Sequence, residues 1–547
     1  MLRSLSLLLP GLLLAPINQA QNCSFRELQE LVPSTVSPSF GSSLDINGDR
    51  IVVGEPGSGA SGVSAAGAVG IYERDPAGQW GLVQTLVASD AALGASFGTA
   101  VAVDGERILV GDPGAGTYGR VYVFDRDPGT GLWLETDQLE PDLSLTPDLR
   151  TFGERLALSG DRAAIAFRRN LAGSAFPDTA VVSMYELSVG QWDRIQNLVS
   201  PQADDEDFFA SDLDLENDRL VVGARDGEDA TGVQTGAVHV FERGSGGTWA
   251  FAQTLLPADG AAADWFGAGV SLSADRVLVG SPRASHSGFR TPGAAYLFEL
   301  SAGAFSQVEK LIASNPAGPD WFGKDVALCG DRALIGGPYA GQGSRGVTYL
   351  FSKDEGGPSA WGEVSFAPAS RPTPFGFFGC TLALGQRYAV IGIEPALNVP
   401  AGAFVFDAPE PGLPATAVLR NAGANPSSLV TTVLQPGQSF FANCDLSTTG
   451  HTAAWLFAFE QRSTVVLPGG QVLLALDAGS GELLSGSGLG PDLGPTATFQ
   501  LLVPDDLSLC GAELTIQALH AFGVVPFALS NAVDLTVGDG RVPVPDW

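Results

Sequence analysis

Short apolar runs separated by glycine, proline and aspartate make up most of the chain. The stretch 97–139 shows the pattern best, with an alternating run over 99–103 and further runs over 108–113, 119–124 and 133–139. Each run has the length of a β-strand and is bounded by turn residues, and none shows the sustained periodicity of an amphipathic helix. The pattern therefore predicts four antiparallel strands connected in sequence order.

This four-strand unit returns seven times along the chain. A phenylalanine opens each copy, and the copies begin 55 to 57 residues apart, at Phe40, Phe97, Phe152, Phe209, Phe266, Phe322 and Phe378. Glycine follows six of these phenylalanines, and Ala210 follows the fourth. An arginine begins the second strand of each copy, at Arg50, Arg107, Arg162, Arg219, Arg276, Arg332 and Arg387. A period this long and regular indicates one supersecondary unit repeated within a single architecture.

The arrangement of the copies predicts an all-β fold, a seven-bladed β-propeller over residues 25–407. Near-continuous apolar runs in the second and third strands indicate sheets that are covered on both faces, as in radial stacking. The seventh copy lacks a fourth strand, whereas residues 25–33, before the first copy, match fourth strands such as 249–257. We therefore predict that the N-terminal strand completes the seventh blade and closes the ring.

The copies resemble FG-GAP repeats, the units of the integrin α-chain propeller and of many secreted bacterial proteins. The resemblance is carried by the Phe-Gly pairs and by Gly-x-Pro at 54–56, 111–113, 280–282 and 336–338. It implies the propeller fold but no particular activity, because one scaffold hosts unrelated functions.

Calcium loops of the integrin-like repeats are shortened in this chain. The resemblance implies an Asp-rich loop between the first and second strands, but the turn here is reduced to forms such as Gly160-Asp161-Arg162. Residues 45–49 are the nearest remnant. Because Ca²⁺ takes six to eight oxygen ligands, we predict no metal and no cofactor, with calcium at these turns as the alternative.

The Phe-Gly period ends before residue 408. Residues 408–414 are rich in proline and read as a linker. Short alternating runs continue over 415–547 and predict an antiparallel β-sandwich. Cys444 and Cys510 both fall in this region and are the favoured candidates for a disulfide.

Residues 1–20 have the pattern of a signal peptide, with an arginine at position 3 and an apolar run over 7–14. No later run is long enough to predict a membrane span. The 60 acidic residues outnumber the 29 basic ones, for a formal charge of −31, and such a surface repels phosphate backbones, which argues against nucleic-acid binding. We therefore expect an exported protein, secreted or at the cell surface.

Candidate ligand-binding residues lie in the loops. Asp264-Trp265 and Asp320-Trp321 precede phenylalanine anchors, where exposed aromatic rings beside acids suit carbohydrate or peptide contact. The alternative places these tryptophans between blades. Loops between second and third strands add four polar candidates, namely Arg225, Asp226, His286 and Arg290. The seven repeat arginines form a predicted ring that either binds an anion or, as we favour, pairs with neighbouring carboxylates and backbone.

No catalytic motif is present: the four histidines are scattered, and there is no Gly-x-Ser-x-Gly, Walker or zinc-binding sequence. His239 replaces an aromatic strand residue and is predicted to be structural. We predict a non-enzymatic binding or adhesion module that recognises an extracellular protein or carbohydrate through loops on one face. The alternatives are a polysaccharide-degrading enzyme with carboxylates at the central channel and a purely structural envelope component.

Overall fold

The computed structural model describes residues 25–33, 37–142, 149–170, 178–202, 207–286, 288, 291–341, 343–354, 356–357, 360–368, 376–393 and 401–408, and the strands between Thr416 and Thr536. The chain divides into two compact units, and Phe25–Pro411 forms one of them. The predicted signal peptide lies outside the described residues, as does nearly all of the predicted linker. No helix occurs within the described ranges.

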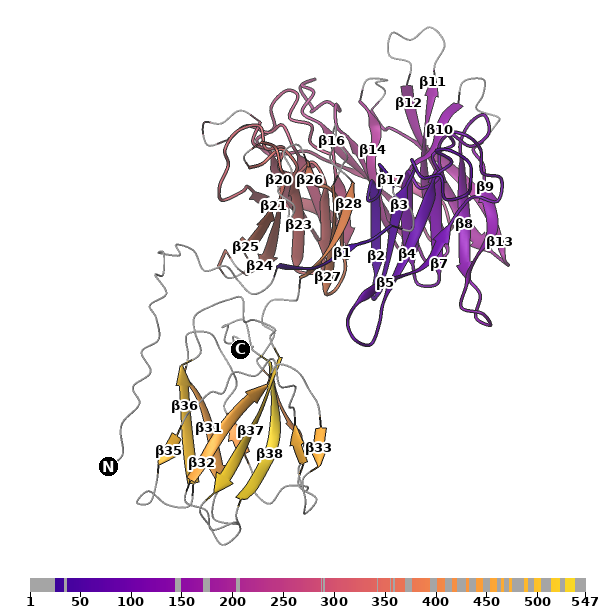
Figure 1. The fold of residues 1–547 in the computed structure, drawn as a ribbon. Coiled ribbons are helices and arrows are strands. Elements are labelled where there is room, and N and C mark those ends of the chain that lie inside the picture. Colours follow the sequence, from indigo (N-terminus) through magenta and orange to yellow (C-terminus); the bar gives the residue numbers. More distant parts are fainter. Residues whose placement is uncertain are drawn as a thin grey trace. The chain divides into compact units, whose positions relative to one another are not determined.

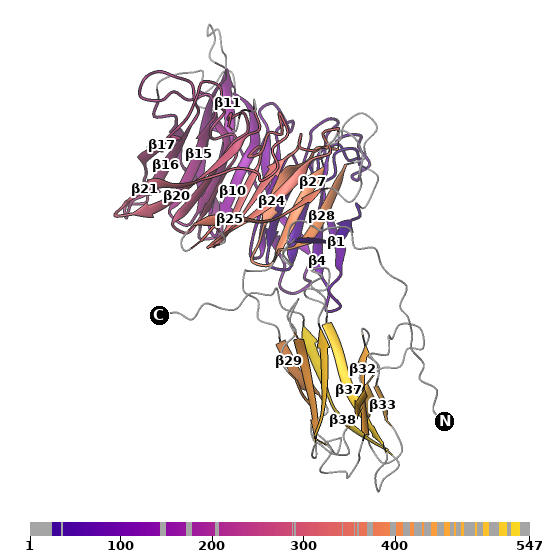
Figure 2. The same cartoon turned by 90° about the vertical axis from the view of Figure 1, so that its left-hand side faces the viewer.

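Phe25–Pro411 folds into seven four-stranded antiparallel sheets, the blades of a propeller (Figures 1 and 2). Blades 1 to 3 are β2 (Ser43–Asn47), β3 (Arg50–Glu55), β4 (Ala68–Arg74), β5 (Trp80–Leu86); β6 (Ala100–Asp104), β7 (Arg107–Asp112), β8 (Arg120–Arg126), β9 (Trp133–Leu139); and β10 (Leu149–Ser159), β11 (Arg162–Asn170), β12 (Asp178–Ser188), β13 (Gln191–Val199). Blades 4 to 6 are β14 (Phe209–Glu216), β15 (Arg219–Ala224), β16 (Ala237–Arg243), β17 (Trp249–Leu255); β18 (Val270–Ser273), β19 (Arg276–Ser281), β20 (Ala294–Ser301), β21 (Ala304–Leu311); and β22 (Val326–Cys329), β23 (Arg332–Gly337), β24 (Val347–Lys353), β25 (Trp361–Pro368). The predicted fold class and number of blades are confirmed.

Blade 7 is built from both ends of the propeller sequence. Its strands are β26 (Phe378–Leu384), β27 (Tyr388–Ile393), β28 (Gly402–Asp407) and β1 (Arg26–Leu31). The N-terminal strand β1 pairs antiparallel with β28, with Leu31 opposite Ala403, and the two lie side by side in Figure 1. The ring is therefore closed by the N-terminal strand, as the sequence predicted.

The repeated glycines let the backbones of neighbouring blades touch. A Cβ atom on the second-strand glycine of one blade would overlap the carbonyl oxygen of the glycine that follows the next phenylalanine anchor. This pairing recurs at six blade boundaries: Gly54 with Gly98, Gly111 with Gly153, Gly223 with Gly267, Gly280 with Gly323, Gly336 with Gly379 and, across the closure, Gly392 with Gly41. At the remaining boundary both positions are alanine, Ala166 and Ala210, which share one buried cluster. Where glycine is replaced at one of the two contacting positions, it is thus replaced at the other as well.

The phenylalanine anchors occupy the core between the blades. Every one of them is at most 1% exposed. Phe322 meets Tyr349 of the third strand with ring centroids 5.2 Å apart, and in blade 4 His239 takes the tyrosine's place, 6.0 Å from Phe209. His239 is fully buried, and burial lowers its pKa to about 4, in accord with the structural role predicted for it.

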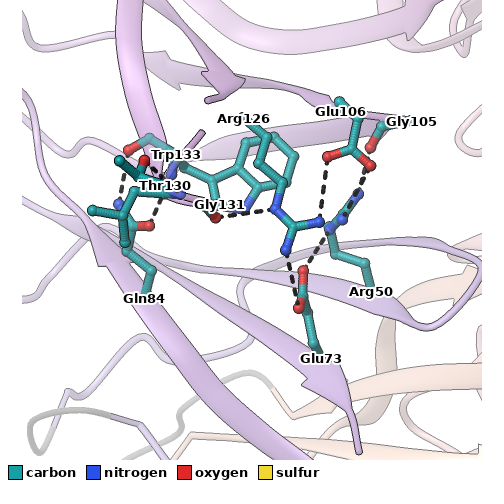
Figure 3. Close-up of polar contacts among 10 residues, drawn as sticks. Arg50, Glu73, Gln84, Gly105, Glu106, Arg126, Thr130, Gly131 and Trp133 are labelled. Atoms are coloured by element: carbon teal, nitrogen blue, oxygen red, sulfur yellow. Dashed lines mark hydrogen bonds and ion pairs between the residues drawn. The ribbon is translucent and has the colours of Figure 1, made fainter. Parts of the chain in front are cut away.

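Arginine side chains join consecutive blades at several boundaries, and Figure 3 shows the boundary between blades 1 and 2. Arg50 forms an ion pair with Glu73 in its own blade (3.1 Å) and donates a hydrogen bond to the carbonyl of Gly105 in blade 2. Its guanidinium carbon also lies 4.7 Å from the centre of the Trp133 ring. Arg107, Arg219 and Arg276 repeat this arrangement at their own boundaries, each over a tryptophan or phenylalanine of the following blade.

Glutamine side chains add a second link near the outer strands. Gln84 of β5 accepts a hydrogen bond from the backbone N–H of Trp133 (2.9 Å) and donates one to its carbonyl (2.8 Å) (Figure 3). Gln196 and Gln253 do the same at later boundaries. Gln29 of β1 makes the equivalent pair of bonds with Trp80 in blade 1. The closing strand is therefore held by the same contacts that join covalently consecutive blades.

Two acidic side chains are buried at the ends of second strands in blades 1 and 2. Glu55 is fully buried and neither of its carboxylate oxygens has a hydrogen-bond partner among the described residues. Burial raises its pKa to about 7. Asp112, at the same position in blade 2, is 1% exposed, and burial likewise raises its pKa to about 7.

We expect Glu55→Ala to change the free energy of unfolding more favourably at pH 8 than near pH 4. In the unfolded chain the pKa of the Glu55 carboxyl is near the ordinary value of 4.5, whereas burial raises it to about 7 in the folded protein. Glu55 therefore costs the folded state free energy as pH rises through this window, about 3 kcal/mol once both states are ionised. Alanine is the natural residue at this position in blade 4, where Ala224 is fully buried. Chemical denaturation at both pH values measures the difference.

Val83→Ala, at an exposed position on β5, removes no titratable group; it is the control and should show no such pH dependence. An identical effect of Glu55→Ala at both pH values would contradict a raised pKa.

The second unit also consists of antiparallel strands, as predicted. Its sheets have the strand orders β29-β38-β37-β32-β35, β30-β31-β36 and β33-β34. Their bounds are β29 (Thr416–Arg420), β30 (Leu429–Thr431), β31 (Ser439–Asp445), β32 (Ala453–Phe459), β33 (Thr464–Val466), β34 (Val472–Leu474), β35 (Ser487–Leu489), β36 (Thr496–Leu502), β37 (Glu513–Ala521) and β38 (Phe527–Thr536). The face-to-face packing of a sandwich stays a prediction. Cys510 lies outside the described residues, so the proposed disulfide does too.

Candidate functional site

Two sets of loops meet on one face of the propeller. The loop that follows the second strand of a blade (the 2–3 loop) is hydrogen-bonded to the loop that enters the same blade (the 4–1 loop). In blades 4, 5 and 6 a backbone N–H of the 2–3 loop donates to the carbonyl of the aspartate two residues before the phenylalanine anchor: Asp226 to Asp207, Arg283 to Asp264 and Tyr339 to Asp320, each at 3.1 Å. We call this surface the loop face.

Aromatic residues occupy the same position of the 4–1 loop in four consecutive blades. They directly precede the anchors and are Phe208, Trp265, Trp321 and Phe377. All four have positive φ, between 46° and 61°. Blades 1 to 3 have Ser39, Ser96 and Thr151 at this position, and the last two share the positive φ. Because a left-handed conformation is unfavourable for large side chains, the turn does not account for the aromatic residues.

These rings form a continuous series with arginine side chains, which we call the arginine–aromatic ladder. Its members are Arg168, Phe208, Arg225, Trp265, Arg283, Trp321, Tyr339 and Phe377. The guanidinium of Arg225 lies 4.5 Å from the Phe208 ring and 5.0 Å from the Trp265 ring, and that of Arg168 lies 5.8 Å from Phe208.

The second half of the ladder is mainly aromatic. Arg283 lies 4.5 Å from the centre of the Trp265 ring. Ring centroids are 5.7 Å apart for Trp265 and Trp321, 4.6 Å for Trp321 and Tyr339 and 4.8 Å for Tyr339 and Phe377. The ladder thus runs from blade 3 to blade 7 across four blade boundaries.

The ladder is at the surface, although its members support one another. Phe208 is 38% and Tyr339 36% exposed, and the two tryptophans are half-buried. Asp226 forms an ion pair with Arg225 at 3.6 Å and also accepts a hydrogen bond from the Trp265 side chain. Burial raises the pKa of Asp226, while Arg225 opposes this shift. Four predicted site residues, Trp265, Trp321, Arg225 and Asp226, are therefore brought together.

The other predicted site residues lie elsewhere or hold the loops. Asp264 and Asp320 are 6% and 5% exposed, and each carboxylate accepts a hydrogen bond at 2.8 Å from a backbone N–H three residues earlier, within its own loop. Both carboxylates are thus positioned to fix the turn that presents the tryptophan. His286 lies 2.9 Å from the carbonyl of Gly293 and forms part of the 2–3 loop of blade 5. Arg290 lies outside the described residues.

A second candidate site, at the propeller axis, was not located from the sequence. A cavity of about 370 Å³ is lined by the first strands of all seven blades. Asp45, Asp212, Asp214 and Asp325 line it, together with Arg155 and Lys324. The alternating Asp-x-Asp of β14 was the available signal, but only the closed ring brings these strands around one axis.

The axial carboxylates bind the backbone of the adjacent blade. Asp45 accepts hydrogen bonds from the N–H groups of Ile46 and Val103, both at 2.7 Å. Asp214 and Asp325 make the same pair of bonds, to the following residue and to the first strand of the next blade. Burial raises the pKa of Asp45 to about 7, although these N–H groups oppose the shift. The first strand is the edge strand of each blade, and its backbone N–H groups facing the cavity have no neighbouring strand. The carboxylates accept hydrogen bonds from these N–H groups.

No group of His, Cys, Asp or Glu within the described ranges has an arrangement that would hold a metal ion. The repeat arginines do not form a free anion-binding ring. Arg332 donates hydrogen bonds to the backbone carbonyls of Gly385, Gln386 and Ala408, and Arg387 pairs with Asp407 of its own blade. Arg50, Arg107, Arg162, Arg219 and Arg276 each pair with a carboxylate of their own blade and with one at the next turn. This is the favoured of the two interpretations of the arginine ring.

Comparison with known proteins identifies the repeats. The family model described as FG-GAP repeat matches residues 80–124, 192–241, 249–298 and 305–351. Each matched segment begins at the fourth strand of one blade and ends at the third strand of the next, so it includes a phenylalanine anchor and a 4–1 loop. No curated protein sequence matches the chain. In the part of the chain that the structure describes, no helix is long and apolar enough for a membrane span.

Proposed function

The chain is an FG-GAP-repeat β-propeller protein, and on this basis we propose that it is an exported binding or adhesion module that recognises its ligand with the loop face of blades 3 to 7. The arginine–aromatic ladder carries the proposal. Aromatic side chains in strained left-handed turns need a reason beyond folding, since serine and threonine fill the same turns in blades 2 and 3. Rigid strands that present variable loops are a common arrangement for recognition.

The asymmetry of the loop face also supports a binding role. The 2–3 loops of blades 1 and 2, residues 56–67 and 113–119, contain no lysine or arginine. Blades 3 to 7 carry all the aromatic and cationic groups of the ladder. A purely structural role at blade boundaries would apply to all seven blades, as the close contact of paired glycines or alanines between blades does.

Catalysis at the axis is the second candidate function, because convergent carboxylates, Arg155 and Lys324 line one cavity. Binding is favoured because both carboxylate oxygens of Asp45, Asp214 and Asp325 already accept backbone hydrogen bonds. Turnover of a polysaccharide that is lost in Asp214→Asn would favour the enzyme instead.

We expect the double variant Trp265→Ser/Trp321→Ser to lose ligand binding at least tenfold while its melting temperature stays within a few degrees of wild type. Serine is compatible with the turn, since Ser96 adopts the same left-handed conformation, with φ of 76°. Binding is measured by biolayer interferometry against a panel of immobilised polysaccharides and purified extracellular proteins. Phe251→Ser, at a 47% exposed position on β17, removes an exposed ring away from the loop face and should leave binding unchanged. Equal binding by the double variant and wild type would overturn the proposal.

A further inference from the structure

We propose that the ligand is an acidic polysaccharide, with its carboxylate or sulfate groups on Arg283 of the ladder and on Arg345 beside it, and its sugar rings against the aromatic side chains. This inference rests on the proposed function of the loop face and specifies the chemistry of its ligand. It is carried by the distribution of arginines, their stacking on rings and the extended course of the ladder.

Four consecutive blades each place at least one arginine at the end of the second strand or in the 2–3 loop that follows it. These arginines include Arg168, Arg225, Arg283 and Arg345. The blade 4 loops also carry acidic residues, at 204–207, 226, 228 and 229, whereas the 2–3 loops of blades 5 and 6, residues 282–293 and 338–346, contain arginine but no aspartate or glutamate. In a chain with a formal charge of −31, these two loops are a local exception. Charges elsewhere on the surface are screened over about 8 Å at physiological ionic strength. An anionic ligand beside these arginines is therefore attracted by them, although the chain as a whole carries a negative charge.

Two of these arginines are available for a ligand. Arg168 pairs with Glu154 at 3.2 Å, and Arg225 with Asp226 at 3.6 Å. Neither Arg283 nor Arg345 forms an ion pair with any carboxylate in the described ranges. Arg345 is exposed, and its carbonyl accepts the backbone N–H of Phe378 at 3.1 Å. This bond places Arg345 next to Phe377, at the aromatic end of the ladder.

Stacking prepares the guanidinium groups for anions. A guanidinium that lies against an aromatic ring keeps its N–H groups in its own plane, where they are free to bind a carboxylate or sulfate with two hydrogen bonds. The contact with Trp265 also restricts the Arg283 side chain, so less conformational entropy is lost on binding. Trp321, Tyr339 and Phe377 extend the same surface with apolar area, against which the C–H faces of sugar rings can pack.

The shape of the ladder favours a polymer that carries separated charges. The series crosses four blade boundaries, which exceeds the reach of a single sugar or amino acid. Single-stranded nucleic acid fits less well, because its bases stack on open aromatic faces, whereas Trp265 and Trp321 pack edge to face at 77°. The denser phosphate charge would also meet stronger repulsion from the acidic protein.

Matched pairs of polymers test the inference. We expect the full-length exported chain to bind at least one of polygalacturonate, alginate and chondroitin sulfate at least ten times more tightly than the corresponding methyl-esterified or desulfated polymer. Binding should weaken as NaCl rises from about 50 to 300 mM. Arg283→Gln/Arg345→Gln should lower the affinity for the acidic form at least tenfold with an unchanged melting temperature. Arg26→Gln, which removes an exposed arginine on β1, should not.

The outcomes separate this inference from the proposed function. Equal binding of acidic and neutral forms, tighter binding of an oligo-dT strand, or full affinity of the double arginine variant would overturn the acidic polysaccharide. The loop-face proposal would survive those results if Trp265→Ser/Trp321→Ser still abolished binding of a neutral glycan or a protein. If that variant abolished no interaction, both would fail.

Discussion

Leu31→Asp should lower the free energy of unfolding by about 4 kcal/mol or more and make the N-terminal strand the first site of proteolysis. Leu31 is 1% exposed and lies in a cluster that joins blade 7 to blade 1, with Phe40 and Tyr72. An unpaired carboxylate there carries the full cost of desolvation. Thermal unfolding and limited proteolysis followed by mass spectrometry measure the effect.

The neighbouring residue provides the control, since Val32 is 71% exposed. Val32→Asp adds the same charge one position later in the chain and should change stability by less than about 0.5 kcal/mol. Similar unfolding of the two variants would show that the ring does not depend on docking of β1. The prediction matters because β1 is joined to blade 7 only by non-covalent contacts.

A second large effect is expected from Gly280→Ala, a loss of about 3 kcal/mol or more. The added methyl group would overlap the backbone carbonyl of Gly323 in the next blade. A backbone atom cannot rotate away as a side chain can, so the two blades must separate and lose packing. The measurement is the change in free energy of unfolding by chemical denaturation.

The alanine pair between blades 3 and 4 supplies the matched control. Ala166→Gly creates at this boundary the glycine found at the others and should cost only about 1 kcal/mol, from backbone entropy. A Gly280→Ala variant as stable as wild type would show that contact between glycines does not set the spacing of the blades.

Repetition is the reason that the fold could be predicted from the sequence. Each apolar run recurs in the other copies, so ambiguity in one copy is removed by comparison with the rest. The missing fourth strand of copy seven and the surplus run at 25–33 allowed only one closure. The C-terminal region has no repeat, and its strands were predicted from alternation alone.

The candidate site was predicted less completely. Trp265 and Trp321, with Phe208, stood out because they precede anchors. Phe377 occupies the same position and could have been found by aligning the copies. Arg283 was not among the predicted site residues. Its stacking on Trp265 depends on how one blade's 2–3 loop approaches its own 4–1 loop, which spacing along the chain does not reveal.

The sequence by itself determined the number of blades, the strand order and the closing strand, because these follow from local hydrophobic periodicity and from counting. Only the tertiary structure decided which polar groups meet. Asp45 and Val103, 58 residues apart, become hydrogen-bonded when the ring brings first strands side by side, and arginines and aromatic residues from five blades form one ladder on the loop face. Contacts between side chains of different blades depend on the rotation from one blade to the next. This rotation is set by glycine contacts and buried phenylalanines between blades, and no single segment of the sequence specifies it.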